Sequence, residues 1–196
     1  MAMTDEEYML RAVELAKKGT GWTNPNPLVG AVIVKDGRII GEGYHKKYGG
    51  LHAEREALAS ANEDVSGATI YVTLEPCCHY GKQPPCVNAI IEAGIKRVVI
   101  GSYDPNPLVA GKGVSILRDH NIIVNDKLVC SEECKSLNYV FFNYIKEKKP
   151  YVILKYAQSL DGKIATHTGL SQWITGETGR AQRKPQEGLA GRGLSF

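Results

Sequence analysis

Long apolar runs are missing from this sequence, and so is the basic, apolar leader of a secreted protein. No stretch of the 196 residues approaches the roughly 18 consecutive apolar residues that a membrane-spanning helix needs. The first eight residues contain Asp5, Glu6 and Glu7 instead of a basic segment followed by an apolar one. We therefore expect a cytoplasmic protein with no secretory signal and no membrane partner.

Cysteines that could pair throughout are also lacking. The chain has five cysteines, an odd number, and Cys77 and Cys78 are adjacent. This pattern does not fit the disulfide framework of a small secreted domain. A reducing compartment fits better, because it would leave thiols available to bind a metal.

A surplus of basic charge is missing from most of the chain. The formal net charge of +3 arises in the last seventeen residues, where Arg180, Arg183, Lys184 and Arg192 outweigh Glu187. Residues 1–179 are therefore neutral overall. Binding to a phosphate backbone usually needs clustered Lys and Arg on one face, so we expect no nucleic-acid partner.

Potential metal ligands are present in two short segments. One is His52-Ala53-Glu54, and the other runs from Pro76-Cys77-Cys78 to Pro84-Pro85-Cys86. His52, Cys77 and Cys86 supply three ligands and leave a fourth zinc position open for water, as catalytic zinc sites do. Zinc lowers the pKa of bound water to roughly 7, and the nearby Glu54 carboxylate can accept the proton. This pattern is the known signature of zinc-dependent deaminases, and it predicts hydrolytic deamination of a nitrogen heterocycle.

Structural roles are the alternatives for these residues. Cys78 or His79 could complete a closed set of four ligands around a structural zinc ion, although adjacent residues rarely both reach one tetrahedral ion. Glu54 could be a carboxylate that only stabilises the first turn of a helix. Three ligands beside a carboxylate favour the open, catalytic site.

Periodicity and turn residues predict a hairpin followed by alternating strands and helices. Helices are expected over 4–18, 53–61, 87–93, 113–119 and 131–148, and strands over 28–34, 38–44, 68–74, 97–101 and 122–125. Asp36-Gly37 between the first two strands is typical of a hairpin turn. The order predicts an α/β fold, a three-layer α/β/α sandwich around a mixed five-stranded sheet.

A change in composition predicts the domain organisation. The charged run Lys146–Pro150 ends the alternating pattern, and Tyr151–Tyr156 has the composition of a further strand. We expect a first domain over residues 1–148, a second segment over 149–179, and a poorly ordered tail over 180–196.

Four motifs carry a resemblance to a known family: Asn24–Gly30, His52–Glu54, Thr73–Cys86 and Asp104–Gly111. Over about residues 4–175 the chain resembles the bifunctional riboflavin biosynthesis deaminase–reductases. Eight residues separate Cys77 from Cys86, whereas most zinc nucleoside deaminases have two between their cysteines.

The resemblance implies a cytidine-deaminase-like fold, a substrate and a set of site residues. The substrate would be 2,5-diamino-6-ribosylamino-4(3H)-pyrimidinone 5′-phosphate, and the products the 5-amino-6-ribosylamino uracil phosphate and ammonia. His52, Cys77 and Cys86 would bind Zn²⁺, and Glu54 would transfer protons. The positions matched near the substrate are Asn26, His45, Lys82, Asp104 and Asn106. The family also suggests a homo-oligomer.

Plain structural roles remain open for the substrate positions. Lys82 would contact phosphate or ribose as a point charge, or it is a solvated loop lysine. A structural role at a strand end explains His45 as well as substrate binding does. Asn26 could simply belong to a turn formed by Asn24-Pro25-Asn26-Pro27. Cys130 and Cys134 are four residues apart and are expected to pack on one helix face.

The resemblance also covers the start of an NADPH-dependent reductase domain of the dihydrofolate reductase type. Ala157, Ser171 and Trp173 match its cofactor and substrate positions, and the match stops after Thr175. About 25 matching residues are far fewer than the roughly 200 such a domain needs. We therefore expect a truncated reductase domain without NADPH-dependent activity.

The sequence is compatible with three other functions. The chain could be another zinc deaminase, acting on cytidine, deoxycytidylate, guanine or tRNA adenosine, but the spacing of its cysteines argues against this. It could be an inactive remnant that serves as a binding or assembly module through apolar surface on residues 151–175. A working reductase is the third, and the length of the chain disfavours it.

Overall fold

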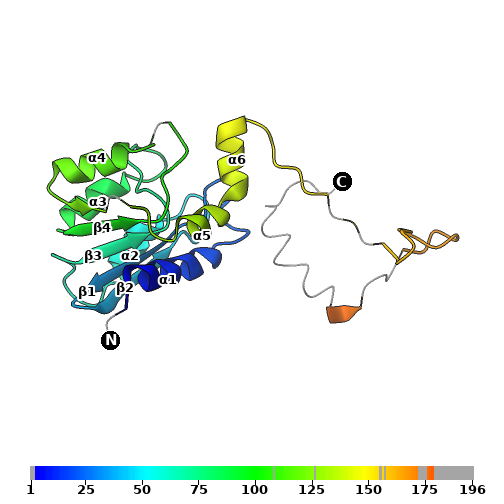
Figure 1. Cartoon of the computed structure of the whole chain (residues 1–196), viewed down its shortest axis with the longest axis horizontal. Helices are drawn as coiled ribbons and strands as arrows, with labels where there is room; N and C mark the ends of the chain where they lie inside the picture. Colours follow the sequence, from blue (N-terminus) through cyan, green and yellow to red (C-terminus); the bar gives the residue numbers. More distant parts are fainter. Residues whose placement is uncertain are drawn as a thin grey trace.

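The computed structural model describes residues 3–107, 109–125, 127–154, 156, 158–171 and 176–178. A five-stranded sheet in the order β2-β1-β3-β4-β5 forms its centre, with helices packed on both faces (Figure 1). The predicted α/β/α sandwich around a mixed sheet is therefore confirmed. Within the described residues, no helix combines the length and the apolar character that crossing a bilayer requires.

The elements follow one another in nearly the predicted order. The strands are β1 (Gly30–Lys35), β2 (Arg38–Tyr44), β3 (Thr69–Val72), β4 (Arg97–Ile100) and β5 (Ile123–Val124). The helices are α1 (Asp5–Lys17), α2 (Ala53–Ser60), α3 (Cys86–Glu92), α4 (Lys112–Asp119), α5 (Ser131–Ser136) and α6 (Tyr139–Glu147).

The sheet combines an antiparallel half with a parallel half. β1 pairs antiparallel with β2 and with β3, whereas β3, β4 and β5 run parallel. The predicted hairpin turn lies between β1 and β2, where Asp36 and Gly37 both have positive φ angles, of 50° and 73°. Positive φ at both central residues is what a tight hairpin of this length requires.

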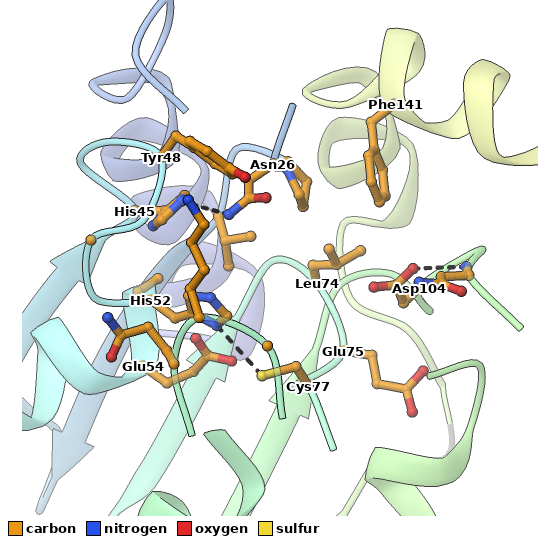
Figure 2. Close-up of a pocket in the computed structure, with 18 of the residues that line it drawn as sticks. Asn26, His45, Tyr48, His52, Glu54, Leu74, Glu75, Cys77, Asp104 and Phe141 are labelled. Atoms are coloured by element: carbon orange, nitrogen blue, oxygen red, sulfur yellow. Dashed lines mark hydrogen bonds between the residues drawn. The ribbon is translucent and has the colours of Figure 1, made fainter. Parts of the chain in front are cut away.

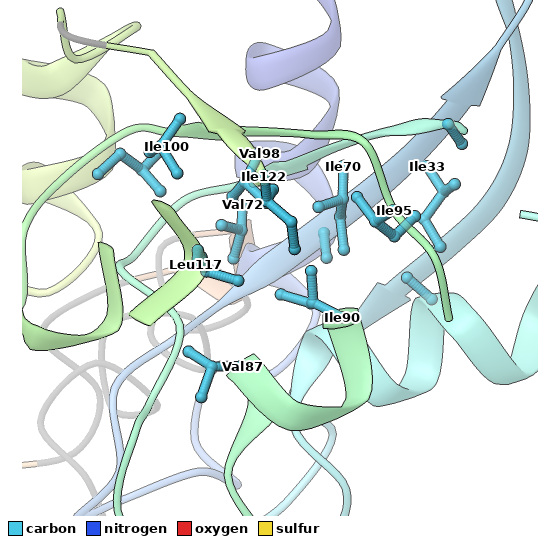
Figure 3. Close-up of a cluster of buried hydrophobic side chains, with 14 of the residues drawn as sticks. Ile33, Ile70, Val72, Val87, Ile90, Ile95, Val98, Ile100, Leu117 and Ile122 are labelled. Atoms are coloured by element: carbon cyan, nitrogen blue, oxygen red, sulfur yellow. The ribbon is translucent and has the colours of Figure 1, made fainter. Parts of the chain in front are cut away.

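Alternation along the strands divides the core into two layers. On one face, Ile33 of β1 and Ile70 of β3 pack with α2, α3 and α4 (Figure 3). On the other face, Val32 of β1 and Tyr71 of β3 pack with α1 and α5. Successive strand residues point to opposite faces, so one apolar strand serves both layers. Cys134 is buried in the second layer as expected, but Cys130 precedes α5 in a left-handed conformation, so the two do not share a helix face.

The start of α1 is tied to the sheet by an ion pair. Asp5 accepts hydrogen bonds from Arg97 at 2.5 and 3.0 Å and from the Tyr71 hydroxyl at 2.7 Å. The Arg97 hydrogen bonds, above all, lower the pKa of Asp5 below its ordinary value. A carboxylate with a depressed folded-state pKa stabilises the protein above its unfolded-state pKa, and this stabilisation is lost as the pH falls through the folded-state value.

We expect wild type to lose more stability than Asp5→Asn when the pH falls from about 6 to about 2. The difference should be no more than about 1 kcal/mol, because both side chains are about one-third exposed and solvent screens the pair. Urea unfolding at both pH values measures it. Glu6→Gln, one residue further along α1, is the control, and equal acid sensitivity of wild type and Asp5→Asn would contradict the prediction.

The single helix predicted over 131–148 is wrong, because α5 and α6 are separate helices. Asn138 interrupts them, with φ −125° and ψ 25°. Its buried side chain accepts a hydrogen bond from Leu28 N–H at 2.7 Å and donates one to Leu28 O at 2.8 Å. This amide satisfies both backbone groups of Leu28, and the helix breaks to bring it there.

Replacing Asn138 by alanine should lower the free energy of unfolding by about 1–3 kcal/mol. The change leaves Leu28 N–H and C=O buried without their partners. Asn143→Ala, on α6 itself, is the matched control and should change stability by less than about 0.5 kcal/mol. Chemical denaturation of the three proteins tests this, and equal effects of the two substitutions would refute it.

The strand predicted over 151–156 is also wrong for the residues described there. Residues 151–154 and 156 form no strand, and Val152 and Leu154 are more than four-fifths exposed. A strand needs a neighbour to pair its backbone groups, and no described strand lies beside this segment. Ala157, Trp173 and the tail 180–196 lie outside the described residues.

Candidate active site

A pocket of about 330 Å³ lies beyond the carboxyl end of β3, at the starts of α2 and α3. Open α/β sheets place ligands at this edge, where the loops that follow the strands meet. Eight of the predicted residues line it: Asn26, His45, His52, Glu54, Cys77, Lys82, Asp104 and Asn106 (Figure 2). The ninth, Cys86, lies in the adjoining cluster of metal-binding atoms.

His52, Cys77 and Cys86 bring their ligand atoms within 4.8 Å of one another. The distance from His52 Nδ1 is 3.4 Å to Cys77 Sγ and 3.4 Å to Cys86 Sγ. Bond lengths of about 2.3 Å to sulfur and about 2.0 Å to nitrogen in a tetrahedron require a separation of about 3.5 Å. The spacing therefore fits one zinc ion with a fourth position open. Among the described residues, neither Cys78 nor His79 joins this cluster.

Local structure explains how the three ligands converge. His52 is the residue that precedes α2, and Cys86 is the first residue of α3. Cys77 lies in the loop after β3, where its sulfur accepts a hydrogen bond from Cys86 N–H at 3.3 Å. The start of a helix favours a negative charge, so two helix N-termini surround the thiolates.

The two thiols titrate as a pair. Hydrogen bonds from Cys86, above all, and from His52 lower the pKa of Cys77 to about 4. The same hydrogen bond, together with burial, raises the pKa of Cys86 well above its ordinary value. Zinc binds both sulfurs as thiolates, so coordination would release the proton that the pair shares.

Glu54 is the buried carboxylate of the pocket. It lies in the first turn of α2 with only 3% of its surface exposed. Burial, above all, raises the pKa of Glu54 to about 7 in the metal-free protein. A carboxyl group with a pKa near neutral pH, beside a set of metal ligands, is suited to accept and return a proton.

His45 and Asn26 form one hydrogen-bonded unit. His45 Nδ1 lies 2.8 Å from the Leu51 carbonyl oxygen, which can only accept, so this nitrogen carries the proton. Nε2 then accepts from Asn26 Nδ2 at 3.2 Å. Burial lowers the pKa of His45, which favours this neutral form. The arrangement fixes the orientation of the Asn26 amide and leaves its carbonyl oxygen on the opposite side.

Lys82, Asp104 and Asn106 complete the predicted set from two further loops. Lys82 Nζ lies 4.0 Å from the centre of the Tyr48 ring, an exposed cation–π contact at the pocket edge. Asp104 accepts a hydrogen bond from Asn106 N–H at 2.8 Å. Burial raises the pKa of Asp104. The three residues offer a positive charge, a carboxyl group and an amide to a polar ligand.

Among the other residues that line the pocket, sequence reasoning did not assign to it the polar and aromatic side chains of Tyr48, Glu75, His79, Gln83 and Phe141. Phe141 belongs to α6, which was predicted only as the end of a longer helix. Tyr48, His79 and Gln83 flank predicted residues within loops, so their proximity to the motifs was the available signal. Figure 2 shows Tyr48 and Phe141 on the opposite side of the pocket from Cys77.

Few classes of protein combine this sandwich with three metal ligands near the starts of two neighbouring helices and a buried carboxylate beside them. The zinc-dependent deaminases do, and the fold and the pocket together define this class. The comparisons with known proteins agree. The chain belongs to the family described as the cytidine and deoxycytidylate deaminase zinc-binding region, which matches residues 2–102.

More specific similarity is to riboflavin biosynthesis proteins. The chain is 62% identical over 180 residues to riboflavin biosynthesis protein RibD of Actinobacillus pleuropneumoniae, covering 92% of this chain and 48% of that protein. It is 51% identical to the RibD protein of Escherichia coli strain K12, covering 91% and 48%. The chain thus spans about half the length of the relatives it matches. Residues 150–190 match the RibD C-terminal domain.

A solved structure gives the same result. The crystal structure of a diaminohydroxyphosphoribosylaminopyrimidine deaminase/5-amino-6-(5-phosphoribosylamino)uracil reductase from Thermotoga maritima superposes with a TM-score of 0.84 at 56% sequence identity. The match covers 92% of this chain and 52% of that one. The cytidine-deaminase-like fold expected from the resemblance is confirmed.

Proposed function

We propose that this protein deaminates 2,5-diamino-6-ribosylamino-4(3H)-pyrimidinone 5′-phosphate. Water replaces the 2-amino group, giving the 5-amino-6-ribosylamino uracil 5′-phosphate and ammonia. The observation that carries the proposal is Glu54, a 3%-exposed carboxylate beside a three-ligand cluster at the base of a polar pocket. The similarity to proteins named for this deaminase step supports the choice of substrate.

His52, Cys77 and Cys86 would hold a zinc ion, which would supply a water molecule that ionises near neutral pH. Glu54 would accept the first proton of the water as its oxygen bonds to the ring carbon, and would deliver that proton to the ring nitrogen beside this carbon. It would then take the second proton from the hydroxyl group now on the carbon and pass it to the amine, so that the C–N bond breaks, the carbonyl forms and ammonia leaves. The buried surroundings of Glu54 shield these transfers from bulk water.

The remaining pocket residues would orient the substrate. The neutral His45 fixes the Asn26 amide, whose free carbonyl oxygen can accept a hydrogen bond from an amino group of the pyrimidine. Lys82 at the exposed edge suits the phosphate or ribose. Asp104 and Asn106 offer further polar groups from the opposite wall.

We further propose that residues 1–148 form the deaminase domain and that residues 149–179 begin a second domain. The last helix of the sandwich ends at Glu147, which supports this boundary. The free cysteines of the described residues support a cytoplasmic location. The exposed apolar side chains Val152, Leu154 and Leu160 support self-association into a homo-oligomer.

The test is ammonia release by the zinc-loaded protein from the diaminopyrimidinone ribotide, measured beside cytidine, deoxycytidylate, guanine and a tRNA adenosine substrate. Turnover of the ribotide alone supports the proposal. Preference for another base would make the protein a different zinc deaminase. Release from no substrate by a fully zinc-loaded protein would favour a binding or assembly module.

A further inference from the structure

Glu75 is a buried carboxylate that is neither one of the three metal ligands nor the group proposed to transfer protons. It is 3% exposed and directly precedes Pro76 and Cys77 in the loop after β3. Although Glu75 lines the pocket, Figure 2 shows its carboxylate turned away from Glu54. A buried charge needs hydrogen-bond partners, and the partners show what Glu75 does.

Both carboxylate oxygens accept hydrogen bonds from the backbone at the start of α4. Gly111 N–H donates to Oε2 at 2.9 Å, and Val114 N–H donates to Oε1 at 3.3 Å. Glu75 N–H in turn donates to Ser102 O at 2.9 Å. Glu75 therefore satisfies N–H groups that α4 cannot bond internally, and its negative charge faces the positive end of that helix.

The contact between α4 and the Cys77 loop leaves no spare room. A Cβ atom on Gly113 would lie 2.4 Å from Pro76 O and 3.2 Å from Glu75 Oε1. The start of α4 thus rests directly against the backbone that leads to Cys77. A shift of either segment would be transmitted to the other.

Backbone hydrogen bonds extend this connection to the pocket wall. Asn106 O accepts from Val109 N–H at 2.8 Å and from Ala110 N–H at 2.9 Å, immediately before Gly111. Asn106 N–H is bonded to Asp104, and both side chains line the pocket. These hydrogen bonds, together with the peptide bond between Ala110 and Gly111, therefore connect Glu75 to the two polar residues of this wall.

We infer that Glu75 is a positioning residue, which clamps residues 109–111 and the start of α4 against the Cys77 loop and so sets where Asp104 and Asn106 meet the substrate. The inference rests on the proposed function for the substrate, but the clamp itself is a property of the protein alone. It predicts that weakening the clamp impairs substrate binding and leaves zinc in place.

The full-length Glu75→Gln protein tests this. Glutamine has one acceptor oxygen, and its amino group faces an N–H donor, so one of the two bonds is lost. We expect KM for the ribotide to rise roughly tenfold while kcat stays within about threefold. Zinc content should stay at wild-type level, and amide hydrogen exchange over residues 104–114 should become faster.

Two further proteins complete the experiment. Glu92→Gln makes the same chemical change at the exposed end of α3 and should behave as wild type. Adding Asn106→Ala to Glu75→Gln should raise KM less than Asn106→Ala does alone, because the two residues act together. Should Glu75→Gln give no folded protein, Glu75→Asp keeps the charge with a shorter reach, and the same measurements apply to it.

Unchanged exchange and unchanged KM in the Glu75 variant would overturn the inference. Loss of zinc with a fall in kcat would overturn it as well, since Glu75 would then support the metal cluster. The exchange measurement needs no substrate. If wild type releases no ammonia from the ribotide, the proposed function fails while the exchange data still decide whether the clamp exists.

Discussion

Replacing Glu54 by glutamine should lower the rate of ammonia release by about 10²–10⁴-fold, the usual contribution of one positioned acid–base group. Glutamine has nearly the same shape but cannot accept a proton. Zinc should stay at about one per chain, because the three ligands are untouched. Turnover of the ribotide and zinc content, measured on the same preparations, check both parts.

Glu56→Gln is the matched control for this experiment. Glu56 lies in the same first turn of α2, but it pairs with Lys46 at 2.6 Å and does not line the pocket. The control should keep wild-type turnover. Near-normal activity of Glu54→Gln would contradict the proton-transfer role, and loss of zinc from it would assign Glu54 to the metal instead.

The adjacent cysteines give the second large effect. Cys77→Ser should lower zinc affinity by more than about 100-fold and abolish ammonia release, because a serine hydroxyl does not ionise to a comparable ligand. Cys78→Ser should retain zinc and activity, since Cys78 lies outside the ligand cluster. Metal analysis after dialysis against a weak chelator measures the difference.

The comparison separates an open site from a closed one. If Cys78 were a fourth ligand of a structural zinc ion, the two serine variants would lose zinc to similar extents. In that case, adding zinc would not restore activity to either serine variant. Loss of zinc from Cys77→Ser alone is the result that agrees with three ligands and a position left for water.

Much of the sandwich could be predicted from local signals. The hairpin followed from Asp36-Gly37 between two predicted strands, and the helix expected over 4–18 is observed as α1. In the structure Thr4 and Glu7 form reciprocal hydrogen bonds, a complete capping box. These signals suffice because the interactions involved join residues that are close in sequence.

The errors arose where distant contacts decide the outcome. The break between α5 and α6 depends on a bond from Asn138 to Leu28, 110 residues away in sequence. A helical pattern carries no trace of that partner. The run Tyr151–Tyr156 has the composition of a strand, but composition does not say whether a neighbouring strand exists to pair with it.

The metal ligands and the proton-transfer residue could be predicted better than the residues that position the rest of the pocket. The ligands and Glu54 follow from residue types at fixed spacing, which the chemistry of zinc restricts. Glu75 sits within the same motif, yet its role depends on the backbone of α4, which no spacing rule reports. Phe141 lines the pocket because of where α6 packs, and the sequence does not indicate that position.

The hydrogen bonds between Asn138 and Leu28 also set an order of events during synthesis. All three zinc ligands and Glu54 lie within the first 86 residues, so they leave the ribosome before Asn138 is added. The contact between Leu28 and Asn138, which closes a loop of 110 residues, can form only after Asn138 has been synthesised. We therefore expect a nascent chain to be able to capture its metal before it can enclose its substrate.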